Sequence, residues 1–322
     1  MKTARFALFA LAATCSLANA QSADSNWPQQ PVKLIVGFPA GTSPDLVART
    51  ISEPLSKSLG TPVVVENKPG AGGNIGVQQV NLARDGHTFG VTTNGPLTTS
   101  KQLYSKLPYD PIKDIKPISL AATSPLVLVT STSVPANNLK EFIAWAKQKQ
   151  GGATYGSVGL GSGSHLTMEL FASRAELPMV HVPYQGFPAV TNAILGQQID
   201  AAFMAPSGAL AQAKAGKVKL LGITSAKPSP LVPDVPTIAE TLPNFEAELW
   251  TAAIAPASMP EPVAARLTKE ISEILQRPEI KEALLKQGWQ AQGTDAQGLV
   301  KRIEADTGVW SKVIQQANVK VE

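Results

Sequence analysis

The sequence predicts an α/β fold, because short apolar runs that are typical of buried strands alternate with segments of helical periodicity. Residues 32–36 form such a run and end at Gly37, apolar side chains then recur at helical spacing from Leu46 to Leu59, and residues 62–66 contain three consecutive valines. This order of strand, helix and strand favours a parallel pair. A chain of 322 residues with 43% hydrophobic residues is long enough for one large domain or two ordinary ones.

The alternation continues towards the carboxyl end. Further strands are predicted at 89–92, 125–130, 153–158, 179–182, 199–203, 219–224 and 248–255. Helices are predicted at 77–82, 139–149, after 164, and at 190–195, 260–276, 279–286 and 297–316, whereas the proline-rich residues 228–243 are predicted to be irregular. We therefore expect helices on both faces of mainly parallel sheets.

The amino terminus has the three parts of a secretory signal peptide. Lys2 and Arg5 precede an apolar run at 6–17, and Ala18-Asn19-Ala20 is a small-residue cleavage signature. The apolar run is shorter than the roughly 20 residues that span a bilayer. We therefore expect residues 1–20 to be a signal peptide that is cleaved after Ala20.

Charge and cysteine usage exclude other classes of protein. The chain carries +4, and removal of Lys2 and Arg5 leaves +2, which is too little for a nucleic-acid-binding protein. The only cysteine, Cys15, lies within the predicted signal peptide, and Thr14 before it fits a lipidation site poorly. The mature chain is therefore expected to have neither disulfides nor thiolate metal ligands.

Metal and cofactor sites are not predicted. The three histidines, His87, His165 and His181, are isolated, and no carboxylate lies at ligand spacing to them. The glycines of residues 156–163 follow a G-x-G-x-G pattern, which differs from the G-x-G-x-x-G of dinucleotide-binding loops.

The first candidate site is the loop at 37–45, which follows the first strand and opens a helix. Ser43 is predicted as the helix N-cap, Pro44 as the first helical residue, and Asp45 lies in the first turn. Backbone N–H groups at such a helix start can bind an anion. The alternative is a well-capped helix in which Asp45 only offsets the helix dipole.

The second candidate site, residues 155–165, has the same design and also raises the possibility of a serine hydrolase. Ser162, Ser164 and His165 are crowded together here, but neither serine satisfies the G-x-S-x-G pattern of a nucleophile elbow. We expect His165 to be a capping or packing residue. The enzyme hypothesis is therefore weak, because no obvious nucleophile and base are paired.

Two further polar clusters follow predicted strands, at 92–95 and 181–186. In the second, Tyr184 could stack on a ligand or bond to it. Each cluster alone is compatible with ordinary turn chemistry. Together with the first two sites they indicate a ligand site, because open α/β sheets bind ligands beyond the carboxyl ends of their strands.

The same segments resemble the receptors of tripartite tricarboxylate transporters, the Bug family of periplasmic solute-binding proteins. The resemblance rests on W-P-x-x-P-V-K-L-I-V-G-F-P-A-G at 27–41, V-V-E-N-K-P-G-A-G-G-N-I-G at 64–76, D-G-H-T at 85–88, Y-G-S-V-G at 155–159, G-S-x-x-H-L at 161–166 when Gly163 and Ser164 fill the variable positions, V-P-Y-Q-G at 182–186 and G-Q-Q-I-D-A-A-F at 196–203. One departure is Gly41-Thr42, where members of the family commonly have Gly-Gly. The ordered series spans nearly all of the mature chain.

The resemblance implies a type II periplasmic-binding-protein fold, with two α/β lobes, crossing hinge strands and a ligand cleft between them. Lobe one is expected at 21–122 plus 251–322 and lobe two at 123–250, with the crossings in irregular stretches near 121–124 and 249–255. The ligand would be a small carboxylate held largely by main-chain N–H groups. The implied ligand-binding residues are Phe38, Ala40, Gly41, Thr42, Ser43, Asp45, Thr93 and Asn94 in lobe one, and Ser157, Ser162, Gly163, Ser164, His165, Tyr184, Gln185, Gly186, Asp200, Met204 and Ser207 in lobe two.

The resemblance also implies a function without catalysis or cofactors. We expect a monomer in the periplasm that delivers its ligand to the permease subunits of a tripartite tricarboxylate-type transporter by hinge closure, and an alternative is a receptor that docks a membrane sensor. An aromatic dicarboxylate such as terephthalate is the favoured ligand, while aliphatic dicarboxylates, tricarboxylates and acidic amino acids stay open. The expected apolar walls are Phe38, Pro39, Phe187, Met204 and Pro206.

Overall fold

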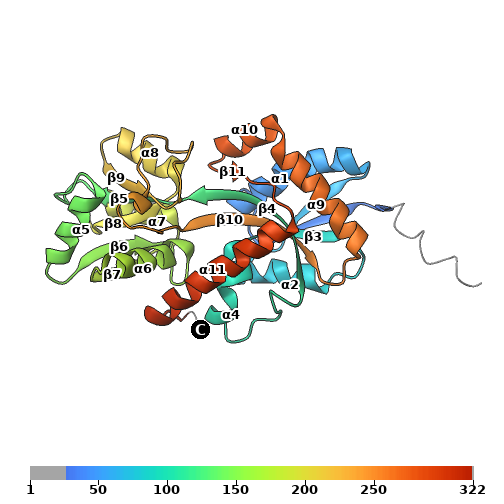
Figure 1. The fold of residues 1–322 in the computed structure, drawn as a ribbon, viewed down its shortest axis with the longest axis horizontal. Helices are drawn as coiled ribbons and strands as arrows, with labels where there is room; N and C mark the ends of the chain where they lie inside the picture. The colour runs from blue at the N-terminus through green and yellow to red at the C-terminus, as the bar shows by residue number, and fades with distance from the viewer. Residues whose placement is uncertain (1–26, 321–322) are drawn as a thin grey trace, which may run out of the picture.

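The computed structural model describes residues 27–320, so the predicted signal peptide and its cleavage site lie outside the described residues. The chain forms two sheets, each covered by helices, and two long strands run between the lobes built on them (Figure 1). Two α/β lobes joined by crossing strands were expected, and this fold class is confirmed. Within residues 27–320, no helix has both the length and the apolar character that a membrane span requires.

The first sheet has six strands in the order β11-β4-β10-β3-β1-β2. Their bounds are β1 (Val32–Val36), β2 (Val63–Asn67), β3 (Thr88–Thr93), β4 (Ile115–Pro125), β10 (Glu248–Pro256) and β11 (Gln290–Ala291). The helices of this part of the chain are α1 (Ser43–Leu59), the short 3₁₀ turn η1 (Ala71–Gly73), α2 (Asn74–Leu82), α3 (Asn94–Thr98), α4 (Ser100–Leu103), α9 (Glu261–Gln276), α10 (Pro278–Lys286) and α11 (Ala296–Gln316).

The second sheet has five strands in the order β7-β6-β8-β5-β9. Their bounds are β5 (Val127–Ser131), β6 (Ala153–Ser157), β7 (Met179–Pro183), β8 (Ala201–Met204) and β9 (Val218–Ile223). Its helices are α5 (Leu139–Gln148), α6 (Gly163–Ala175), α7 (Phe187–Leu195), α8 (Pro206–Lys214) and the 3₁₀ turn η2 (Ile238–Glu240).

Two predictions about the sheets were wrong. Both sheets are mixed: β10 is antiparallel to β3 and β4, and β5 is antiparallel to β8 and β9. The crossings near 121–124 and 249–255 are not irregular either, because they belong to the long strands β4 and β10. In the first sheet the cause is the crossing between lobes: β4 leaves this sheet, and β10 returns to it from the second and inserts between β3 and β4 against the direction of both.

Helix α11 packs against both lobes. Near its start, Leu299 is buried in an apolar cluster with Trp250 and Ile254 of the first sheet. Further along, Trp310, Val313 and Ile314 are buried in a cluster that holds the core of the second sheet. The long red helix in Figure 1 therefore connects the two cores, and the division into residues 21–122 plus 251–322 and residues 123–250 stays a prediction.

Candidate functional site

A cavity of about 470 Å³ is lined by residues from both lobes. One wall holds the β1–α1 and β3–α3 loops, the opposite wall holds the β6–α6 loop and the start of α7, and the crossing strand β10 contributes Glu248 to Trp250. The predicted ligand residues that line it are Phe38, Thr42, Ser43, Thr93, Asn94, Ser162 and Gly163. Loops far apart in the sequence thus meet at one cavity.

The β1–α1 loop differs from the prediction at its cap. Thr42, and not Ser43, is the N-cap of α1, so the helix starts one residue earlier than expected. The Thr42 hydroxyl donates to the carbonyl oxygen of Pro39 at 2.6 Å, and the N–H of Gly41 donates to the Asp45 carboxylate at 2.8 Å. The first backbone hydrogen bond of the helix runs from the N–H of Leu46 to the carbonyl oxygen of Thr42. The N–H groups of Ser43 and Asp45 therefore have no acceptor within residues 27–320.

The buried carboxylate of Asp45 holds this loop in shape from below. Arg49 donates to it at 2.9 Å, and the Asn67 amide donates both to it at 2.8 Å and to the carbonyl oxygen of Phe38 at 2.9 Å. Burial alone would raise the pKa of Asp45, but the hydrogen bonds from Arg49, Asn67 and Gly41 outweigh it and lower that pKa. Asp45 stays charged and compensated, and it does not line the cavity.

Glycines allow the 70–76 segment to pack directly on the β1–α1 loop. Gly73 has φ +99°, and a Cβ there would lie 2.6 Å from the ring of Phe38. A Cβ on Gly76 would lie 2.3 Å from the Cα of Gly37. This close approach places Phe38 at the cavity wall and explains why a glycine-rich segment follows the second strand.

The β6–α6 loop repeats the design of the first loop with a neutral acceptor. Ser162 is the N-cap of α6, and its hydroxyl accepts from the N–H of His165 at 3.3 Å. The N–H of Gly161 donates to Nδ1 of His165 at 3.0 Å. In the first loop, the N–H of Gly41 donates in the same way to the Asp45 carboxylate. The N–H groups of Gly163 and Ser164 have no acceptor within the described chain. His165 therefore caps and packs, as predicted.

His165 belongs to a stack of rings behind this loop, in which His165 and Tyr155 are buried and His181 is half-buried. Its ring lies 4.0 Å from that of His181, whose ring lies 4.9 Å from that of Tyr155. His181 Nε2 is 2.7 Å from the Ser157 hydroxyl, and the Tyr155 hydroxyl donates to Glu169. Burial, reinforced by His181, lowers the pKa of His165 to about 4, and burial lowers the pKa of His181. Both rings are therefore neutral at pH 7, and His165 accepts through Nδ1.

Several predicted site residues lie away from the cavity. They are Ala40, Gly41, Asp45, Ser157, Ser164, His165, Tyr184, Gln185, Gly186, Asp200, Met204 and Ser207. Asp200 precedes β8 at the opposite end of that strand, where it accepts from the N–H of Thr154 at 2.7 Å and pairs with Lys149. Met204 is buried in an apolar cluster of the second sheet. Ser157 and His165 instead support the loop from behind.

The apolar walls were only partly predicted. Phe38 and Phe187 line the cavity, whereas Pro39, Met204 and Pro206 do not. Residues that sequence reasoning missed supply most of the remaining wall, and they are Leu103, Tyr104, Leu166, Leu249, Trp250, Trp289 and Trp310. These residues come from α4, α6, β10, the turn after α10, and α11, so no sequence motif groups them.

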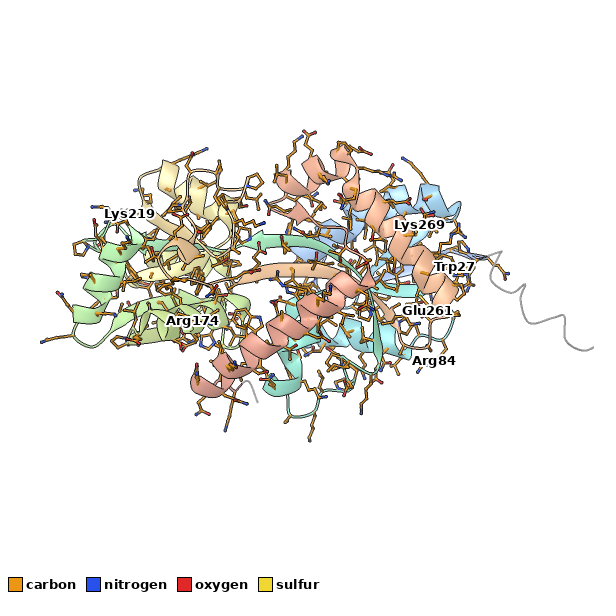
Figure 2. The ribbon with its side chains drawn as sticks, in the orientation of Figure 1. Trp27, Arg84, Arg174, Lys219, Glu261 and Lys269 are labelled. Atoms are coloured by element: carbon orange, nitrogen blue, oxygen red, sulfur yellow. The ribbon has the colours of Figure 1, made fainter. Side chains whose placement is uncertain are left out.

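Among residues 27–320, Glu248 is the one charged residue that lines this cavity. Arg302 of α11 lies 3.6 Å from Glu248, 3.2 Å from Glu246 and 3.0 Å from Asp306. Burial raises the pKa of Glu248, while Arg302 opposes that rise. Figure 2 labels four basic side chains, Arg84 and Lys269 on the first lobe and Arg174 and Lys219 on the second, and none of them lines the cavity.

The donors that the cavity offers to an anion are therefore backbone N–H groups and hydroxyls. Two helix starts face it from opposite lobes, and each combines free N–H groups with the positive end of a helix dipole. Among residues 27–320, no group of three or more histidine, cysteine, aspartate or glutamate side chains is arranged to hold a metal ion. The arrangement suits reversible binding of a carboxylate.

Comparison with known proteins agrees with this geometry. The sequence profile of the tripartite tricarboxylate transporter family receptor matches residues 47–319. Protein BugT of Bordetella pertussis is 36% identical over 280 residues, covering 86% of this chain and 85% of BugT. An R. palustris protein solved with adipate is 29% identical with a TM-score of 0.77, covering 91% and 99% of the two chains. MatC of Rhodopseudomonas palustris, solved with bound malate, is 30% identical with a TM-score of 0.73, covering 89% and 100%.

These matches extend over most of the chain and share its two-lobed architecture. The chain therefore belongs to the Bug family of tripartite tricarboxylate transporter receptors, which are non-enzymatic periplasmic solute-binding proteins.

Proposed function

We propose that this receptor captures a dicarboxylate, preferably an aromatic one such as terephthalate, and delivers it to the permease subunits of a tripartite tricarboxylate-type transporter. In this proposal it acts as a monomer in the periplasm, after cleavage behind Ala20. The predicted site residues that line the cavity contact the ligand, while the loops are held in shape by Gly41, Asp45, Ser157, Ser164 and His165.

One observation carries the proposal: two helix starts with free N–H groups face one cavity from opposite lobes. Ser43 supplies such a group on α1 and Gly163 supplies one on α6, and both residues line the cavity. A carboxylate at each end of a ligand would gain several charge-assisted hydrogen bonds without a buried cation. A ligand with two carboxylates can thus bridge the lobes.

The lining supports an aromatic or otherwise flat ligand body between the two carboxylates. Phe38, Tyr104, Phe187 and the three tryptophans Trp250, Trp289 and Trp310 line a cavity of about 470 Å³. Aromatic walls favour stacking of a planar ring. The relatives solved with adipate and with malate bind aliphatic dicarboxylates, so the shared chemistry is the pair of carboxylates.

Hinge closure is the proposed mechanism of capture. The lobes are connected through β4 and β10, which pair over their whole shared length, so small backbone rotations where the chain leaves that pair would move one lobe towards the other. A ligand that contacts both loops binds the closed arrangement better and so increases its population.

The test is a ligand panel on protein stripped by unfolding and refolding. Thermal shift and calorimetry would compare terephthalate, aliphatic dicarboxylates, citrate and benzoate. We expect dicarboxylates to raise the unfolding midpoint more than benzoate, with terephthalate giving the largest shift. If no carboxylate stabilises the protein, the proposed function is wrong; if only aliphatic dicarboxylates do so, the aromatic preference alone is wrong.

A further inference from the structure

Trp310 carries a hydrogen-bond donor that the described chain does not satisfy. Its side chain lines the cavity and is only 4% exposed, and its indole nitrogen is buried without an acceptor within residues 27–320. Buried donors in native proteins nearly always have a partner, so such a group in a ligand cavity points to the ligand.

The neighbouring tryptophan shows that this wall can supply an acceptor. The indole N–H of Trp250 donates to Asp306 of α11 at 2.6 Å. Asp306 precedes Trp310 by four residues, so the two side chains share one face of the helix. The chain thus pairs one cavity-lining indole with a carboxylate and leaves the next one unpaired.

Trp310 lies where a ligand held by both loops would pass. It packs in one apolar cluster with Leu103 of α4 and Leu166 of α6, and all three line the cavity. Leu166 belongs to the first turns of α6, whose start supplies the second set of free N–H groups. The indole nitrogen itself exposes almost no surface in this arrangement, so an acceptor on the ligand would reach it as the lobes close around the ligand.

The charge of the adjacent wall limits what that acceptor can be. Three carboxylates, from Glu246, Glu248 and Asp306, surround the single guanidinium of Arg302, and Glu248 lines the cavity. A further carboxylate beside this cluster would meet surplus negative charge, whereas an uncharged oxygen would not.

We propose that the indole N–H of Trp310 donates a hydrogen bond to an uncharged hydroxyl or carbonyl oxygen on a dicarboxylate held by the two loops. This inference rests on the proposed function and narrows it, because the preferred ligand then carries an oxygen substituent between its carboxylates. Trp310 is thus a specificity-determining residue that α11 contributes to the cavity.

Calorimetry with matched ligand pairs tests the proposal. The pairs are terephthalate with 2-hydroxyterephthalate, and glutarate with 2-oxoglutarate. We expect the wild-type protein to bind the oxygenated member of at least one pair about tenfold more tightly, which is the worth of one buried hydrogen bond. Trp310→Phe should reduce that preference to less than about threefold, measured within the variant so that any change in affinity common to both members of a pair cancels, while the Trp145→Phe control, outside the cavity, should keep it.

Two results would overturn the proposal alone: equal affinities within both pairs, or an undiminished preference in Trp310→Phe. If no dicarboxylate binds the wild-type protein, the proposed function fails first. Trp310→Phe also removes buried ring volume, so a lower melting midpoint of the ligand-free variant reports lost packing, and the test rests on the ligand pairs compared within each protein.

An NMR experiment on the unaltered binding site is independent of how well that variant folds. The chain has five tryptophans, so the indole N–H signals of ¹⁵N-labelled protein are few enough to assign. We expect the Trp310 signal to move downfield when the oxygenated dicarboxylate binds and to move little with the unsubstituted one. Identical shifts with both ligands would refute the proposal.

Discussion

The pH dependence of His165 gives the sharpest test of how the second-lobe loop is built. The folded protein holds this ring neutral, between His181 of β7, Tyr155 of β6 and Glu169 of its own helix, and its Nδ1 accepts the N–H of Gly161. Protonation would add a charge in a buried site and remove that acceptor. The variant His165→Asn keeps a neutral acceptor but cannot take up a proton.

The magnitude follows from the pKa of His165 in the two states. Burial and His181 lower this pKa from 6.5 to about 4 in the folded protein, so the unfolded chain binds the proton more tightly. At about 1.4 kcal/mol per pH unit, this difference corresponds to about 3 kcal/mol of unfolding free energy. That stability is fully present above pH 6.5 and is lost as the pH falls towards 4. Because the rings of His165 and His181 interact, the pH range over which stability is lost reflects the titration of both histidines together.

The assay is urea unfolding of wild type and His165→Asn at intervals from pH 7.5 to 4, followed by tryptophan fluorescence. When the two free energies of unfolding are subtracted, the pH-dependent contributions of the groups that both proteins share cancel. We expect this difference to shift by about 2–3 kcal/mol in favour of the variant between pH 7 and pH 4. Parallel stability curves over that range would refute the account of His165 as a buried neutral acceptor.

Three further substitutions probe the rest of the site. Ser43→Pro removes a free N–H at the first residue of α1, a position that accepts proline, so calorimetry should show about 10- to 100-fold weaker dicarboxylate binding, while Ser43→Ala, which keeps the N–H, should change binding much less. Glu248→Gln removes a carboxyl group whose pKa is raised by burial, although Arg302 opposes the rise. The free energy of unfolding of this variant, relative to that of the wild-type protein, should therefore increase as the pH rises above 4.5. A relative stability that decreases with rising pH would contradict this. Gly73→Ala should destabilise the fold by about 2 kcal/mol or more in urea unfolding, through its positive φ and its clash with Phe38, and a neutral result would contradict the close packing.

Local patterns predicted most of the elements because their causes are local. The helical spacing from Leu46 to Leu59 and the three valines of β2 specify their elements without reference to distant residues. The N-cap of α1 was predicted at Ser43 but lies at Thr42. Both are good capping residues, and the choice depends on the contacts of Asp45 with Asn67 and Arg49. One of these partners, Asn67, lies 22 positions from Asp45 along the chain.

Long-range pairing explains the wrong predictions for the sheets. The predicted strand at 125–130 corresponds to β5, and β4 was not predicted, although its residues Ile115–Pro125 pair with β10, more than a hundred positions later. A strand in the middle of a mixed sheet has no local signal for the direction of its neighbours. The parallel units β1–β2 and β6–β7 were readable because a helix connects their strands.

The sequence by itself determined the α/β class, the family, and the two helix-opening loops that offer backbone N–H groups. These features reside in short contiguous segments, where glycine, proline and hydroxyl side chains control the local backbone. Only the tertiary structure decided which side chains share the cavity: it placed Asp45 and His165 behind the loops and brought Glu248, Trp289 and Trp310 to the wall. The reason is physical, because a cavity wall is defined by contact through space and burial, which depend on how whole elements pack against one another.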